Sequence, residues 1–199
     1  DGMLDYETLI TNATPVADAY RHDDDLAGIF YTGGTTGFPK GAMLTHKSLW
    51  TSSVSVLLEA GVKEDDTYLH AGPMFHLADG AFSNAAFLVG SAHCFLPSFT
   101  PQATIDVINK YNATHTLLIP VMIQMVTATM QETGASLDSL KCVLYGASPI
   151  PESVLKEALK TFPNTSFIQG YGQTELSPIV TMLGSKYHVT EGTYAGKLK

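Results

Sequence analysis

The sequence predicts an α/β domain, a layered sheet with helices on both faces. Short apolar runs alternate with amphipathic stretches along the 199 residues, as they do where strands alternate with helices. Glycine turns follow two of these runs, at Gly146 and at Gly170. In open α/β sheets ligands bind beyond the carboxyl ends of the strands, so both turns are expected to face one crevice. We see no repeat, low-complexity tract or linker, and expect one domain over residues 1–199.

The elements are expected in a regular order. Strands over residues 26–30 and 42–44 flank a loop rich in glycine and threonine. Thr45 can cap a helix over residues 46–59, and Gly61 can end it. The remaining strands are expected over residues 67–71, 92–96, 116–119, 142–145 and 166–169, and the remaining helices over 77–89, 102–111, 121–131 and 152–161. Three prolines stand where a first helical turn can accept them, namely Pro101, Pro120 and Pro151.

Composition and charge restrict the classes of function. A chain that is 45% hydrophobic and 15% charged has the composition of a globular domain. The formal net charge is −8 and Arg21 is the single arginine, so the basic stripe of a nucleic-acid-binding protein is absent. Asp23, Asp24 and Asp25 are expected to form a solvated loop, with a metal site as the less favoured alternative.

The cysteines and the apolar runs indicate the compartment. Cys94 and Cys142 lack C-x-x-C spacing, so neither a disulfide framework nor a zinc framework is indicated. No apolar run approaches the roughly 20 residues that a transmembrane helix needs. A cytoplasmic location without a transmembrane segment is therefore expected.

Residues 31–41 read Tyr-Thr-Gly-Gly-Thr-Thr-Gly-Phe-Pro-Lys-Gly and have the chemistry of a phosphate-binding loop. Glycines can adopt positive φ and bring backbone N–H groups close to an anion. Threonine hydroxyls add hydrogen-bond donors, and a lysine adds a mobile positive charge. The expected phosphate ligands are Thr32, Gly33, Gly34, Thr35, Thr36, Gly37 and Lys40.

The loop has two alternative interpretations. The Walker A pattern G-x-x-x-x-G-K-[ST] would indicate a nucleoside triphosphatase or a kinase. It does not match, because Phe38 and Pro39 directly precede Lys40 and Gly41 follows it. The second alternative is a glycine-rich hairpin that binds no ligand.

The loop resembles the phosphate-loop signature of the adenylate-forming superfamily, which contains acyl- and aryl-CoA synthetases, luciferases and the adenylation domains of peptide synthetases. Gly33 stands where serine is common in that signature. Three further motifs resemble the family in the same order and at similar spacing, namely Pro73-Met74-Phe75-His76, Gly146-Ala147-Ser148-Pro149-Ile150 and Gly170-Tyr171-Gly172-Gln173-Thr174-Glu175. The resemblance covers nearly the whole chain and is greatest to the fatty-acyl-CoA synthetases.

The resemblance implies that two of these motifs bind the nucleotide. Tyr171 would stack on the adenine, and Glu175 would hold Mg²⁺, which takes one or two protein carboxylates together with phosphate oxygens. Lys40, Thr174 and Glu175 would be the catalytic residues. The implied ATP contacts outside the loop are Gly146, Ala147, Ser148, Gly170, Tyr171, Gly172, Gln173 and Thr174.

The resemblance also implies an acyl site near the entrance for the pantetheine arm. The implied substrate contacts are His76, Asp79, Gly80 and Gly170. Two alternatives for His76 stay open: a hydrogen-bonded core histidine, and a zinc ligand together with His70 or His93.

The implied reaction has two steps. A small-molecule carboxylate attacks the α-phosphate of ATP to give an acyl-adenylate and pyrophosphate, and coenzyme A then displaces AMP to give the thioester. Lys40 would hold the departing phosphates, and Mg²⁺ would offset their charge. ATP, Mg²⁺ and coenzyme A are therefore the implied cofactors and co-substrates. Gly33, the segment over residues 73–81 and Gln173 favour fatty acyl substrates over aryl ones.

Family members continue beyond the motifs found here. A Thr-Gly-Asp segment, a hinge and a small C-terminal domain with the adenylation lysine are not among the 199 residues. We therefore expect the middle part of a larger N-terminal domain, unable to complete turnover and able to self-associate through exposed sheet edges. The alternative functions are a nucleotide-binding or regulatory module without catalysis and, more remotely, a P-loop kinase.

Overall fold

The structure is a computed structural model that describes residues 3–33, 37–189 and 191–196. In chain order it contains α1 (Tyr6–Asn12), β1 (Leu26–Thr32), β2 (Lys40–Thr45), α2 (His46–Ala60), β3 (Thr67–His70), α3 (Leu77–Leu88), β4 (Ala92–Phe95), α4 (Pro101–Tyr111), β5 (His115–Leu117), α5 (Pro120–Thr133), β6 (Cys142–Gly146), α6 (Glu152–Thr161), β7 (Ser166–Gly172) and β8 (Ile179–Leu183). Two short 3-10 helices are η1 (Thr174–Leu176) and η2 (Ser185–Tyr187).

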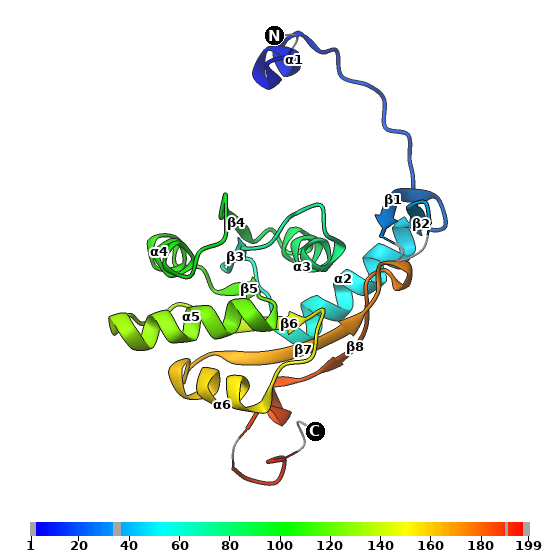
Figure 1. The fold of residues 1–199 in the computed structure, drawn as a ribbon. Helices are drawn as coiled ribbons and strands as arrows, with labels where there is room; N and C mark the ends of the chain where they lie inside the picture. Colours follow the sequence, from blue (N-terminus) through cyan, green and yellow to red (C-terminus); the bar gives the residue numbers. More distant parts are fainter. Residues whose placement is uncertain (1–2, 34–36, 190, 197–199) are drawn as a thin grey trace.

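A six-stranded sheet in the order β4-β3-β5-β6-β7-β8 forms the centre of the fold. β8 is antiparallel to β7, and the other neighbouring strands are parallel. Helices α2 and α3 pack on one face, and α4, α5 and α6 pack on the other (Figure 1). The predicted α/β class with helices on both faces is therefore confirmed. β1 and β2 form a separate antiparallel hairpin.

Successive residues of the central strands point to opposite faces of the sheet. Leu69, Val143 and Tyr145 pack in the core under α4, α5 and α6. Tyr68 and Leu144, their neighbours in sequence, pack in the core under α2 and α3. Because both faces are covered, β6 reads as a continuous apolar run rather than as an alternating one.

The helix signals of the sequence are largely confirmed. The Ser48 amide donates to Thr45 Oγ1 and the Thr45 amide donates to Ser48 Oγ, both at 3.2 Å, which closes the start of α2. Gly61 ends α2 in the left-handed region with φ of 66°. Pro101 and Pro120 begin α4 and α5 as predicted. The placement of Pro151 in a first turn is wrong, because it is the cap residue that precedes α6.

Three features of the chain differ from the prediction. The strand expected over residues 116–119 begins one residue earlier and ends two residues earlier, at His115–Leu117, because Ile119 already caps α5. α1 and β8 were not predicted. Residues 13–22 have no regular secondary structure and are exposed, and they separate α1 from the rest of the fold in Figure 1. No Gly/Ser-rich composition marks this segment in the sequence, and the expectation of one domain stays a prediction.

Neither a membrane-spanning helix nor a reactive thiol is found in the part of the chain that the structure describes. Cys94 and Cys142 are free and buried. Burial raises the pKa of the Cys94 thiol to about 11 and that of the Cys142 thiol to about 12. Both side chains are therefore neutral thiols that fill the core.

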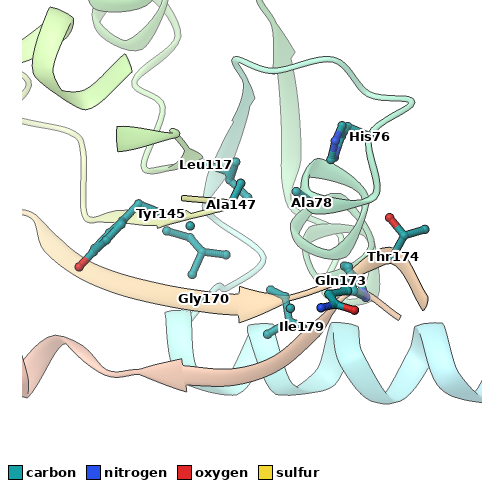
Figure 2. A pocket seen from close by; sticks show the side chains of 13 residues that line it. His76, Ala78, Leu117, Tyr145, Ala147, Gly170, Gln173, Thr174 and Ile179 are labelled. Atoms are coloured by element: carbon teal, nitrogen blue, oxygen red, sulfur yellow. The ribbon is translucent and has the colours of Figure 1, made fainter. Parts of the chain in front are cut away.

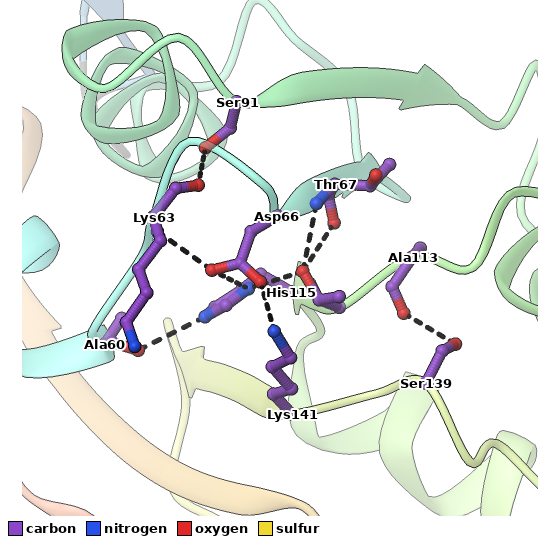
Figure 3. Close-up of polar contacts among 10 residues, drawn as sticks. Ala60, Lys63, Asp66, Thr67, Ser91, Ala113, His115, Ser139 and Lys141 are labelled. Carbon is purple, nitrogen blue, oxygen red and sulfur yellow. Dashed lines mark hydrogen bonds and ion pairs between the residues drawn. The ribbon is translucent and has the colours of Figure 1, made fainter.

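A buried carboxylate joins three strands at the amino edge of the sheet (Figure 3). Asp66 is 2% exposed, and its oxygens accept hydrogen bonds from the Lys63 amide at 2.8 Å and from Lys141 Nζ at 2.7 Å. Burial by itself would raise the pKa of Asp66, but the bonds from Lys141 and Lys63 outweigh it and lower that pKa. His115 lies beside the carboxylate, and burial lowers the pKa of its imidazole. The imidazole is therefore neutral near pH 7 and donates from Nε2 to the Ala60 carbonyl at 3.2 Å.

Lys141→Met tests this network. The substitution leaves the buried Asp66 carboxylate without its charged partner, so we expect the free energy of unfolding to fall by about 2 kcal/mol. Lys160→Met is the matched control, because Lys160 pairs with Glu157 at 2.7 Å on the exposed surface. Urea unfolding followed by circular dichroism measures both variants. Equal urea midpoints for Lys141→Met and Lys160→Met would contradict the stabilising role of the Asp66–Lys141 pair.

Candidate functional site

Three separate motifs line one pocket at the carboxyl edge of the sheet (Figure 2). The turn after β6, the end of β7 with the residues that follow it, and the segment that enters α3 meet there. The pocket has a volume of about 100 Å³. Its lining residues are His76, Ala78, Leu117, Leu144, Tyr145, Gly146, Ala147, Gly170, Gly172, Gln173, Thr174, Pro178 and Ile179.

Two of the glycines are required because main chains approach each other closely. Gly146 of β6 is paired with Gly170 of β7, and a Cβ on Gly146 would overlap the Gly170 carbonyl oxygen. A Cβ on Gly172 would overlap the Pro178 carbonyl oxygen. Gly170 differs, because a Cβ there would meet only ordinary contacts at 3.7 Å or more. The first two glycines thus let the strands close around the pocket.

The turn after β6 has a strained backbone. Ala147 has φ of 64°, in the left-handed region that residues with a Cβ rarely adopt. It follows Gly146 directly, and both line the pocket. Strain of this kind collects at ligand-binding sites, where the surrounding structure holds it in place. Ser148, the next residue, is exposed.

The segment before α3 brings His76 to the pocket. His76 is the residue that caps α3, but its side chain makes no capping hydrogen bond, and the ring is exposed. Figure 2 shows the ring above Ala78 and on the same side of the pocket as Thr174. The pocket position of His76 excludes the alternative of a buried core histidine.

The zinc alternative for His76 finds no support. Among the described residues no group of three or more His, Cys, Asp or Glu side chains is arranged to hold a metal ion. His70 Nε2 and His93 Nδ1 lie 2.9 Å apart and hydrogen-bond each other. His76 makes no interaction with either ring.

The hairpin that carries the phosphate loop lies next to the motif of Thr174 and Glu175. Thr32 ends β1 opposite Lys40 at the start of β2, and Thr32 Oγ1 donates to the Lys40 carbonyl at 3.4 Å. β2 in turn contacts η1, which begins at Thr174. Gly33 and Gly37 are exposed, whereas the predicted ligands Gly34, Thr35 and Thr36 lie outside the described residues. The fold therefore brings both motifs to the same side of the sheet.

The remaining predicted residues fall in different places. Tyr171 is 60% exposed, so its ring is available for stacking, and Glu175 is exposed in the first turn of η1. Gly80 lies inside α3 and does not line the pocket. Asp79 does not line it either: it is 3% exposed, and its two oxygens bond Tyr68 and His70. The buried, hydrogen-bonded position of Asp79 therefore does not support the predicted contact between its side chain and the substrate.

Several lining residues were missed from the sequence. They are the apolar side chains or backbone segments of Leu117, Leu144, Tyr145, Pro178 and Ile179. A core residue and a pocket wall have the same apolar character, so no local pattern distinguishes them. Only the strand order, which places β5 beside β6 and β8 beside β7, shows that these residues meet.

Tyr145 also connects the pocket to the C-terminal segment. Its hydroxyl lies 2.9 Å from His188 Nε2, and His188 Nδ1 lies 3.0 Å from the Gly184 carbonyl oxygen. The carbonyl can only accept, so Nδ1 carries the proton and Nε2 accepts from the tyrosine. Burial lowers the pKa of His188 and raises that of Tyr145 to about 12, so both groups are neutral near pH 7.

The family model for AMP-binding enzymes matches residues 1–198. The chain belongs to the AMP-binding enzyme family. It is similar to a feruloyl-CoA synthase from Amycolatopsis, with 36% identity over 169 residues that cover 84% of this chain and 34% of that protein. The resemblance to adenylate-forming CoA ligases is therefore confirmed. The chain spans about a third of the length of the curated relatives it matches.

Two solved structures illustrate the same likeness. O-succinylbenzoate coenzyme A synthetase from Bacillus subtilis, in complex with AMP, superposes with a TM-score of 0.79 at 28% identity, over 92% of this chain and 38% of that one. The same enzyme is also solved with ATP and a magnesium ion. A long-chain-fatty-acid-CoA ligase from Archaeoglobus fulgidus superposes with a TM-score of 0.75 at 29% identity, over 86% of this chain and 36% of that one.

Gly146→Ala and Gly170→Ala form a matched pair, because the two residues face each other across β6 and β7. We expect Gly146→Ala to lower the free energy of unfolding by about 1 to 3 kcal/mol, since the new methyl must displace the Gly170 carbonyl. Gly170→Ala should fold with stability close to that of the unsubstituted chain. Thermal unfolding of both variants checks this, and equal losses would show that the strands are not as close as described.

Proposed function

We propose that the chain is the ATP- and acyl-binding part of an acyl-CoA synthetase, an acid-thiol ligase. The observation that carries the proposal is the convergence of three motifs on one pocket at the carboxyl edge of the sheet. Ligands of α/β sheets bind at that edge. Membership of the AMP-binding enzyme family supports the same class of reaction.

The nucleotide would lie along the two glycine turns. The backbone at Gly146 and Ala147 and the exposed ring of Tyr171 offer a surface for a flat base. The loop that leads into β2 at Lys40 would bind the phosphates, because β2 contacts η1, which begins at Thr174. Lys40 Nζ would then offset the charge of the departing pyrophosphate.

Glu175 fits the requirements for a magnesium ligand. Its carboxylate is exposed at the start of η1, next to the phosphate hairpin. Mg²⁺ takes one or two protein carboxylates and completes its shell with phosphate oxygens and water, so a single exposed carboxylate is sufficient. Bound there, the ion would supply charge stabilisation to the phosphates.

The acyl group would enter the apolar part of the pocket. None of the thirteen lining residues is a lysine or an arginine, and Leu117, Leu144 and Ile179 form apolar walls. A second carboxylate on the substrate would therefore be buried without a charged partner, which is costly. We infer an uncharged acyl tail, fatty in the first instance, with an aryl tail as the alternative. One relative is named for feruloyl and another for a long-chain fatty acid, so the relatives do not choose between an aryl tail and a fatty tail.

A module that binds nucleotide without turnover is the second candidate. The glycine turns after β6 and β7 would serve it equally, because they offer a surface for a nucleotide whether or not a reaction follows. Coenzyme A, the second co-substrate of the proposed reaction, would enter past His76, which is exposed at the rim.

Calorimetric titration of the chain with Mg-ATP tests the proposal. Lys40→Ala and Glu175→Ala should each weaken binding by about tenfold, because each removes a charged contact to the phosphates or their metal. Lys47→Ala is the matched control, since Lys47 lies in the first turn of α2 outside the loop. Stable sulfamoyl mimics of fatty and aryl acyl-adenylates, titrated in the same way, separate the two substrate classes.

The outcomes of this titration test the phosphate site and the uncharged acyl tail separately. Identical affinity of all three variants for Mg-ATP would overturn the assignment of the phosphate site. Tighter binding of a mimic with a free second carboxylate would overturn the inference of an uncharged tail.

A further inference from the structure

A buried hydrogen-bond cluster joins β3 to the first turn of α3. The Tyr68 hydroxyl donates to Asp79 Oδ1 at 2.7 Å, and His70 Nδ1 lies 2.7 Å from Asp79 Oδ2. A carboxylate can only accept, so His70 carries a proton on Nδ1. Tyr68, His70 and Asp79 are each no more than 3% exposed. We call these three residues the β3–α3 clamp.

Aromatic packing holds both donors of the clamp in place. The Tyr68 ring stacks on Phe82 of α3 with centroids 4.5 Å apart and planes 3° from parallel. The His70 ring stacks on Phe95 of β4 at 4.6 Å and 9°. The carboxylate of Asp79 is therefore fixed by donors that have little freedom to follow it. Any shift of the first turn of α3 would break one of the two bonds.

The first turn of α3 also fixes the position of His76. The amides of Asp79 and Gly80 donate to the His76 carbonyl at 3.1 Å and 3.3 Å, and the His76 amide donates to the Pro73 carbonyl at 2.9 Å. No side-chain hydrogen bond caps α3 at His76. The backbone at His76 is thus attached to the clamp one helical turn away.

We propose that the β3–α3 clamp is a positioning device for the acyl end of the pocket. Tyr68, His70 and Asp79 do not line the pocket themselves. They act through His76 and Ala78, which do, and which belong to the same turn as Asp79. The inference rests on the proposed function, because it assigns the His76 side of the pocket to the acyl group.

The clamp predicts an effect that a purely stabilising cluster would not have. Loss of Asp79 should weaken contacts at the acyl end and leave the nucleotide end, built on β6 and β7, unchanged. A cluster that only stabilises the fold would affect both ends equally or neither. Asp66 is the matched control, because it is also a carboxylate of 2% exposure bonded at the opposite end of β3.

The experiment compares Asp79→Asn with Asp66→Asn in the 199-residue chain. Each variant is titrated with AMP and with dodecanoyl-sulfamoyl adenosine, a stable mimic of an acyl-adenylate. For Asp79→Asn we expect AMP affinity within about twofold of the unsubstituted chain and a loss of about tenfold for the acyl mimic. Asp66→Asn should bind both compounds as the unsubstituted chain does, although its stability falls.

A second variant and a spectroscopic measurement keep the inference testable. Tyr68→Phe removes one bond of the clamp and keeps the stacking on Phe82, so it covers the case in which Asp79→Asn does not fold. Nuclear magnetic resonance of the histidine rings should show a changed His76 signal in either clamp variant and an unchanged His188 signal.

The possible failures are distinguishable. Unchanged acyl affinity in a folded clamp variant, or equal losses in the Asp79 and Asp66 variants, would overturn the clamp. Failure of the unsubstituted chain to bind AMP would instead count against the proposed function. In that case the resonance of the His76 ring still tests whether the clamp positions His76. An unchanged His76 signal in both Tyr68→Phe and Asp79→Asn would refute that role.

Discussion

The close approach of β6 and β7 is the constraint on which the site depends. Gly146 and Gly170 face each other so closely that a side chain on Gly146 would overlap the opposite carbonyl. Gly172 meets the Pro178 carbonyl in the same way, which folds the end of β7 back along β8. The turns that follow both strands line one small apolar pocket. At Gly146 and Gly172 the family motifs are thus requirements of backbone packing.

The amino and carboxyl edges of the sheet differ in how their polar groups are buried and paired. Before the strands, Asp66 joins the starts of β3, β5 and β6 through Lys141 and the Thr114–His115 pair, and its role is to stabilise the fold. Beyond the carboxyl ends of the strands lie the pocket, exposed polar residues and Ala147 with its strained backbone. A buried charge thus stabilises the fold at the amino edge, whereas polar groups at the carboxyl edge stay exposed. Among the described residues, Asp79 of the β3–α3 clamp is the buried carboxylate at the carboxyl edge.

The fold class and the main motifs could be predicted from local signals. Thr45 and Gly61 limit α2 through caps, and glycine turns mark the ends of β6 and β7, because these signals depend on a few neighbouring residues. The pocket wall formed by Leu117, Leu144 and Ile179 could not be predicted, since it depends on strand order. The hydrogen-bond partners of Asp79 could not be predicted for the same reason: Tyr68 and His70 lie on another element, and only packing shows that they bind its carboxylate.

The central claim is that a nucleotide binds where the β6 and β7 turns meet. A backbone-amide resonance titration of the isotopically labelled chain with AMP measures this most directly. The account predicts that the largest shift changes occur at Gly146, Ala147 and residues 170–174, with little change around Asp66 and His115. Shift changes concentrated at the amino edge of the sheet, or none at either glycine turn at saturating AMP, would contradict it.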